Sequence, residues 1–235
     1  MTLLSLVQKF CVRNGLPIPV VVAGSTDPQI LQIMHLLEEE GNDLAQRHPW
    51  TVLQQEVLLT TLAAEDQGAI ETIAPGFRFI RNNSIWDRTD QLPLYGPIDG
   101  QEWQERKAVS TAGPRYHWRF RGGHLLSNPS PPAGHTWAFE YQSKNWILSS
   151  NGVTTKSELQ SDLDTFLLQD TILLMGIRWR WKKEKGLSYA EEFNSYEMQI
   201  KDAMGRDGGK PRIMADSDYS DARPMIAINP MSWPL

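Results

Sequence analysis

The period of the hydrophobic pattern changes twice along this chain, and that change constrains the fold more than any other feature. Residues 2–13 and 27–46 place apolar side chains at the spacing of an amphipathic helix, and this spacing returns from residue 161 onward. Between them, residues 65–155 are rich in Gly, Pro, Asn and Trp and contain short strand-like runs. This order predicts helical segments on both sides of an inserted β-rich region.

Capping residues set the ends of the first two predicted helices. Asn14 and Gly15 end the first one, because glycine readily takes the left-handed conformation that follows a helix. Asp27 is a good N-cap for the second, and Pro28 suits its first turn. Pro49 stops that helix after about residue 46.

The middle of the chain carries three local signals. Residues 135–142 alternate large aromatic residues with smaller or polar ones, which predicts a strand with one buried face. Gly122 and Gly123 predict a tight turn after a strand-like run. Asp99 and Glu102 form a capping pattern, so we expect one short helix just after them.

A third long helix is expected to begin near Ser161. Its buried face would carry Leu163, Phe166, Leu167, Leu173, Leu174, Ile177 and Trp181. The pattern places Asp162, Asp164 and Asp170 in the first half of this helix, where the helix dipole favours acidic side chains.

A cluster of cations follows at the end of the same helix. It consists of Arg178, Arg180, Lys182, Lys183 and Lys185. These residues either form a solvated helix end that complements the dipole or contact a partner or DNA, and the sequence leaves both interpretations open. Gly186 is expected to end the helix, and Ser188 with Glu191 predicts a capping box for a fourth helix running to about Met204.

Composition excludes several classes of protein. The formal net charge of −5 argues against a protein that wraps nucleic acid with a basic surface. The single cysteine, Cys11, excludes an internal disulfide framework and a multi-cysteine zinc site. We expect a soluble chain, because the N-terminal residues lack a basic signal-peptide start and no apolar run approaches the length of a bilayer span.

No catalytic or cofactor-binding motif is present. Phosphate-binding loops, dinucleotide fingerprints, nucleophile elbows and zinc-protease motifs are all missing from the sequence. The histidines are scattered at His35, His48, His117, His124 and His135, and a metal site built from the last three has weak support. The run Glu38–Glu40 is interpreted as a solvated helix face. We therefore expect no enzyme, cofactor or metal.

Residues after 206 lose all helical periodicity but keep regularly placed apolar side chains. These are Ile213, Met214, Met225, Ile226, Ile228, Met231, Trp233 and Leu235. An extended arm with such anchors is suited to binding another chain by strand addition or pocket insertion. The alternative is a disordered terminus whose apolar residues are incidental.

Five segments together resemble one family. They read STDPQILQIMHLLEEEGNDLAQRHPW, LLTTLAAEDQG, IWDRT…LYGPIDGQEWQ, PSPPAGHTWAFEYQSKNWI and GIRWRWKKEKGLSYAEE. In order and spacing, residues 1–205 resemble the head-to-tail adaptor (connector) proteins of short-tailed double-stranded DNA bacteriophages. The segment 207–235 is similar only in type.

The resemblance implies a structural virion protein. Such adaptors form a ring, usually a dodecamer, beneath the portal protein, where they extend the DNA ejection channel and provide a platform for the tail tube or nozzle. It implies a location at the head–tail interface of the virion, reached by assembly in the host cytoplasm. It also implies that the C-terminal arm enters grooves between portal subunits. The portal-binding residues would be Met225, Ile226, Ile228, Met231, Trp233 and Leu235, with Trp233 as the anchor.

The fold expected from pattern and resemblance is α+β. A helical bundle would comprise residues 1-50 and 155-206, a β-rich, sandwich-like domain would be inserted at 51-154, and an extended arm would follow at 207-235. Twelve copies of a −5 chain carry on the order of −60, so an acidic lumen would let DNA pass without specific binding. Glu38–Glu40 and Asp162–Asp170 are the candidates for lining it.

Two alternatives remain at this stage. The chain could be another neck or tail-tube completion protein of the virion. It could also be a nucleic-acid-binding protein that uses the Trp, Arg and Lys residues of segment 176–186 as a stacking clamp.

Overall fold

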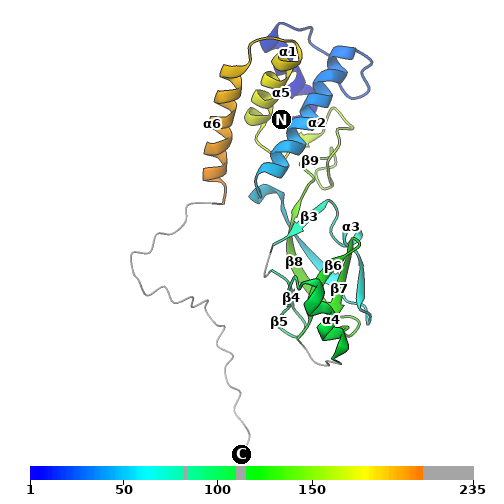
Figure 1. Cartoon of the computed structure of the whole chain (residues 1–235). Helices are drawn as coiled ribbons and strands as arrows, with labels where there is room; N and C mark the ends of the chain where they lie inside the picture. The colour runs from blue at the N-terminus through cyan, green and yellow to red at the C-terminus, as the bar shows by residue number, and fades with distance from the viewer. Residues whose placement is uncertain (82–83, 110–114, 209–235) are drawn as a thin grey trace, which may run out of the picture.

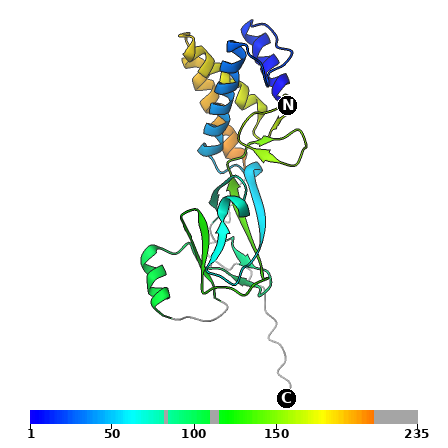
Figure 2. The same ribbon diagram turned by 90° about the vertical axis from the view of Figure 1, so that its right-hand side faces the viewer.

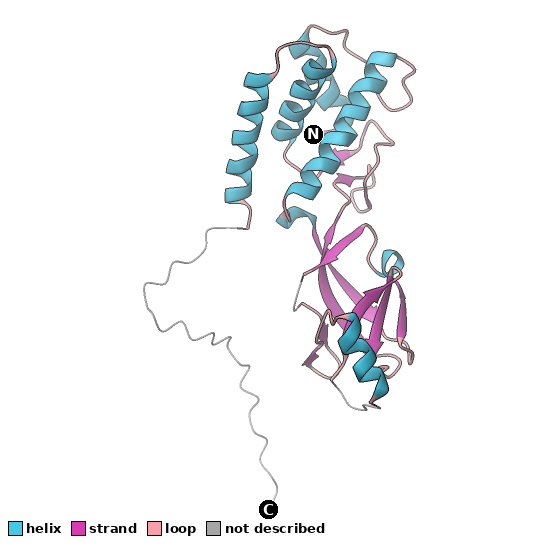
Figure 3. Ribbon diagram, in the orientation of Figure 1, coloured by secondary structure: helices cyan, strands magenta, loops and turns pink. Residues whose placement is uncertain are grey.

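The protein is a mixed α+β chain. The structure, a computed structural model, describes residues 1–81, 84–109 and 115–208. Within these ranges it contains both α-helices and antiparallel sheets (Figure 3). The proposed portal-binding residues Met225 to Leu235 lie outside the described residues.

Four helices gather at one end of the molecule (Figure 1). They are α1 (Leu3–Asn14), α2 (Pro28–Arg47), α5 (Asp170–Glu184) and α6 (Ala190–Arg206). Helix α5 packs against the other three. The predicted ends of α1 and α2 are confirmed: Gly15 adopts the left-handed conformation with φ 66°, and the Asp27 side chain accepts a hydrogen bond from the backbone N–H of Gln29.

The larger sheet is organised around β8 (Thr136–Ser143). On one side β8 pairs over residues 136–142 with β1 (Gln54–Thr60), in antiparallel register. On the other side it pairs first with β4 (Trp86–Asp87) and then with β3 (Phe77–Ile80), while β5 (Leu92–Pro93) extends the sheet beyond β4. Strand β8 is therefore the central strand of this sheet.

A second antiparallel sheet has the order β2, β7, β6. Its strands are β2 (Asp66–Ala69), β7 (His124–Asn128) and β6 (His117–Arg121). A single turn, α3 (Ile70–Ile73), follows β2, and α4 (Gly100–Ala108) lies at the outer side of this part of the molecule (Figure 2).

The two local predictions for this region are confirmed. Gly122 and Gly123 both have positive φ and form the turn between β6 and β7. Asp99 is the N-cap of α4, and its carboxylate accepts a hydrogen bond from the backbone N–H of Glu102 at 2.8 Å.

A third, small sheet lies between the larger sheet and α5 in the sequence. It consists of β9 (Ile147–Leu148) between β10 (Thr155–Lys156) and β11 (Thr165–Phe166). A 3-10 helix, Thr51–Leu53, connects α2 to β1.

Buried apolar side chains form two separate clusters among the described residues. One joins the four long helices and includes Trp50, Trp146 and Ile147, so the first strand of the small sheet packs with the helices. The other lies among the strands and includes Trp118 and Trp137. The predicted division into a helical domain (1-50 and 155-206) and an inserted domain (51-154) remains a prediction.

Polar contacts join the helical end to the larger sheet. The guanidinium of Arg78, in β3, donates to the carbonyls of Ala45 and Gln46 in the last turn of α2, at 2.6 and 2.7 Å. The side-chain amide of Gln142, in β8, donates to the carbonyl of Trp50. These bonds satisfy backbone carbonyls that a helix end and its following loop leave without partners.

The predicted start of the third helix is wrong. Helix α5 begins at Asp170, and the preceding residues include strand β11. Leu163, expected on the buried face, is 65% exposed. The Asp162 carboxylate instead accepts hydrogen bonds from the backbone N–H groups of Val22 and Ala23, so tertiary contacts override the apolar spacing.

Two smaller predictions are also wrong. Strand β8 is buried on both faces except at Glu140 and its half-buried first residue, because Ala138 lies between the larger side chains of Leu58 and Trp86 and Gln142 bonds to the carbonyl of Trp50. The capping box from Ser188 to Glu191 does not form: the N-cap of α6 is Tyr189, and its side chain makes no capping hydrogen bond.

Candidate functional site

The cations at the end of α5 are largely engaged by other parts of the chain. Arg178 and Lys182 both pair with the Glu192 carboxylate. Lys183 lies over the ring of Trp179 at 6.0 Å. Lys185 donates to the side chain of Gln32 at 2.9 Å.

Arg180 is the most heavily bonded of these cations. Its guanidinium reaches three carboxylates of α2: Glu40 at 2.8 Å, Glu39 at 2.5 Å and Asp43 at 3.0 Å. The opposing charges outweigh the effect of burial, so the pKa of Arg180 is raised. Arg180 therefore ties α5 to α2 and is not available to an external phosphate.

Glu40 is the centre of this network. It is 0% exposed and accepts hydrogen bonds from Arg180 and from the hydroxyl of Tyr196 in α6. Burial raises the pKa of Glu40, against the opposing effect of these two hydrogen bonds. Gly176 makes room for it, because a Cβ at that position would overlap the Glu40 carboxyl.

These positions correct two expectations about acidic residues. Glu40 is not part of a solvated face and cannot line a lumen. Asp164 is also 0% exposed; its carboxylate accepts from the backbone N–H groups of Gln160 and Ser161 and pairs with Lys156 at 2.7 Å. Of the predicted lumen candidates, Glu39 remains exposed on α2.

An apolar groove lies at the end of the helices nearest the larger sheet. We call it the Trp50 groove; its volume is about 200 Å³. Its walls include Leu44, Trp50, Val52, Leu168, Ile172 and Ala203. Arg206 and Asp207, the last turn and C-cap of α6, form part of its rim.

The outer face of the larger sheet exposes an apolar row. Leu58 of β1 and Trp86 of β4 lie opposite Ala138 of β8 on its two sides. Leu58 is 60% exposed and Trp86 41% exposed. Next to this row, Glu56 and Glu140 are directly opposite each other, an arrangement that is unfavourable unless a cation lies nearby.

Arg88 supplies one such cation, because it pairs with Glu56. Trp86, Ala138 and the two glutamates line a shallow hollow on this face. The sequence did not indicate this surface, because its members come from three strands that are far apart in the chain.

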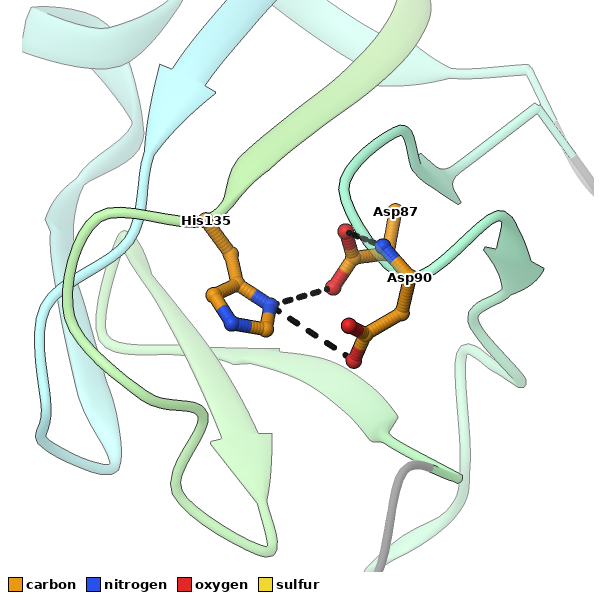
Figure 4. Close-up of side chains that lie close together, drawn as sticks. All are labelled: Asp87, Asp90 and His135. Atoms are coloured by element: carbon orange, nitrogen blue, oxygen red, sulfur yellow. Dashed lines mark hydrogen bonds and ion pairs between the residues drawn. The ribbon is translucent and has the colours of Figure 1, made fainter.

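One cluster has the composition of a metal site. Figure 4 shows the His135 ring pointing toward Asp87 and Asp90. Its Nδ1 lies 3.1 Å from a carboxylate oxygen of Asp87 and 3.6 Å from one of Asp90. Asp87 also accepts from Trp137 Nε1 and from the backbone N–H groups of Thr89 and Asp90.

These bonds saturate Asp87 without a metal ion. Burial alone would raise the pKa of Asp87, but the hydrogen bonds from Asp90, His135 and Trp137 outweigh it and lower the pKa. The cluster fastens the β4–β5 turn to the start of β8. The three histidines that could have converged do not: His124 pairs with Asp66, and His117 stacks on Tyr95.

No family model matches this chain, and no curated protein matches it. None of the helices in the described ranges has the length and apolar character needed to cross a membrane.

Proposed function

We propose that this protein is a head-to-tail adaptor of a short-tailed double-stranded DNA bacteriophage. It forms a ring, in twelve copies, beneath the portal protein, extends the DNA channel and offers a platform to the tail tube or nozzle. In this proposal the helices form a ring-forming bundle, and the strands form a sandwich-like insertion that faces the tail or the ring exterior. The protein acts without catalysis or cofactor.

The observation that carries the proposal is the apolar C-terminal segment and the point from which it leaves the folded part. The Asp207 carboxylate accepts hydrogen bonds from the backbone N–H and the hydroxyl of Thr51 and lies 3.1 Å from His48 Nε2. The chain therefore leaves α6 at a fixed place. Eight large apolar residues follow between 213 and 235, enough to bind a neighbouring protein in several pockets.

Two further observations support an assembly protein. In the row of Leu58, Ala138 and Trp86, the exposed side chains of Leu58 and Trp86 form an apolar surface that a neighbouring copy in a ring would bury. The cations of α5 are paired inside the chain, which leaves little basic surface there for gripping DNA. A protein that surrounds DNA without holding it fits both.

A docking experiment tests the proposal. Purified chain is mixed with its portal, and binding is measured by sedimentation for the full chain, for a chain truncated after Asp207 and for Trp233→Ala. The truncated chain should fail to dock, and Trp233→Ala should dock at least about tenfold more weakly, as expected for an aromatic anchor. Val153→Ala, at an exposed loop position, is the matched control and should dock normally.

Undiminished docking after truncation would refute the portal-binding role of the arm. Absence of docking by the full chain would favour another neck or tail component.

A further inference from the structure

The Trp50 groove has the size of a site for one large apolar side chain. Its volume of about 200 Å³ is below that of a typical small-molecule pocket, which begins at about 300 Å³. Its walls are mostly aliphatic and aromatic, and Val52 on its rim is 49% exposed. Binding of an apolar side chain in an open apolar site of this size is favourable, because it removes apolar surface from water.

The described chain ends at the rim of this same groove. Arg206 and Asp207 line it, and a Cβ on Gly208 would lie 3.6 Å from Thr51 Cγ2, beside the groove. Figure 1 shows α6 leading the chain to the end of the helical part at which α2 also ends. Twenty-seven residues follow Gly208 in the sequence.

The first large apolar residues of that segment are Ile213 and Met214. Ile213 is the fifth residue after Gly208, and five residue steps span up to about 17 Å. Because the groove begins at the exit point itself, this length is sufficient for a side chain at position 213 or 214 to reach it. A tether this short also gives the side chain a high effective concentration at the groove.

We propose that, in the free chain, the Trp50 groove is occupied by Ile213 or Met214 of the same molecule. This contact holds the beginning of the C-terminal segment against the end of α6, whereas residues 225–235 lie beyond it. The inference does not rest on the adaptor function, because it concerns the isolated chain. If the protein is an adaptor, the contact fixes the place from which the arm leaves the folded part.

Cysteine protection tests this assignment in the full-length chain. Cys11 is buried, so a cysteine introduced by Val52→Cys supplies the reactive thiol on the groove rim. Its alkylation rate is measured in three backgrounds: otherwise unchanged, with Ile213→Ser and Met214→Ser, and with Met225→Ser and Ile226→Ser. The last pair removes the same amount of apolar surface farther along the segment and is the matched control.

The Ile213→Ser and Met214→Ser changes should speed alkylation about tenfold, and the control pair should leave it unchanged. Protection should be independent of protein concentration. Equal rates in all three backgrounds would overturn the proposal. Protection that grows with concentration would also overturn it, since the occupant would then belong to a second copy. No portal is present in this assay, so its failure is distinct from failure of the docking experiment.

Discussion

Replacing Arg180 by Met should reveal how strongly the buried network holds α2, α5 and α6 together. Met has a similar length without charge, so the change removes the cation and leaves Glu40 buried beside the Tyr196 hydroxyl alone. Breaking a buried ion pair on one side costs about 3–5 kcal/mol, because the remaining charge has no compensation. We expect a loss of that size in the free energy of unfolding at pH 8.

The pH dependence of this loss gives a second signature. Burial already raises the pKa of Glu40, and removing Arg180 raises it further. A carboxyl whose pKa is higher in the folded than in the unfolded state stabilises the fold as the pH falls through its folded pKa. The deficit of Arg180→Met relative to the wild type should therefore shrink as the pH falls from 8 toward the ordinary Glu pKa of about 4.3.

Urea unfolding followed by circular dichroism in the helix band measures both effects. Lys183→Met removes an exposed cation three residues farther along the same helix and should cost less than about 1 kcal/mol. Adding Glu40→Gln to Arg180→Met should restore part of the lost stability, because the buried charge is then gone. A deficit for Arg180→Met no larger than that of Lys183→Met, or one that does not change with pH, would refute the reasoning.

Three further predictions follow from single contacts. Gly176→Ala should destabilise by about 1–3 kcal/mol through overlap with the Glu40 carboxyl, whereas Gly205→Ala, with open space around it in α6, should be neutral or stabilising; thermal unfolding compares the two. Asp164→Asn should cost about 2 kcal/mol at neutral pH in chemical denaturation. Burial raises the pKa of Asp164, but the opposing bonds from Lys156 and two backbone N–H groups lower it overall. The stabilisation that the Asp164 carboxylate provides is therefore present above the ordinary Asp pKa of about 3.9 and disappears as the pH falls through the lower pKa of the folded state. Arg78→Ala should cost about 1–2 kcal/mol and raise hydrogen exchange at the end of α2, since the carbonyls it caps lose their donors.

The parts of the fold that follow from local chemistry were predictable from the sequence. Asp27 and Gly15 mark helix ends through bonds made within a few residues, and Gly122 with Gly123 favours a tight turn. In each case the signal and the structure it determines lie in the same short segment.

The predictions that were wrong share a physical cause. Residues 161–169 have helical apolar spacing, but Asp162 and Asp164 bond to loop backbone and Phe166 pairs with β9, so distant partners decide the outcome. Glu40 reads as one of three solvated glutamates because its burial depends on Gly176 and Tyr196, which belong to other helices. A single-sequence pattern contains no information on such pairings.

The candidate surfaces were missed for the same reason. The row of Leu58, Ala138 and Trp86 exists only in the paired register of three strands. The Trp50 groove combines residues from α2, α5, α6 and the loop that precedes β1. By contrast, the apolar content of 213–235 is evident in the sequence, and its role remains a proposal.

Electron microscopy of the purified chain mixed with its portal tests the central claim most directly. The adaptor account predicts a ring of twelve copies beneath the portal with the full-length chain, and bare portals with the chain truncated after Asp207. Bare portals with the full-length chain, under conditions in which the portal itself is intact, would contradict the account.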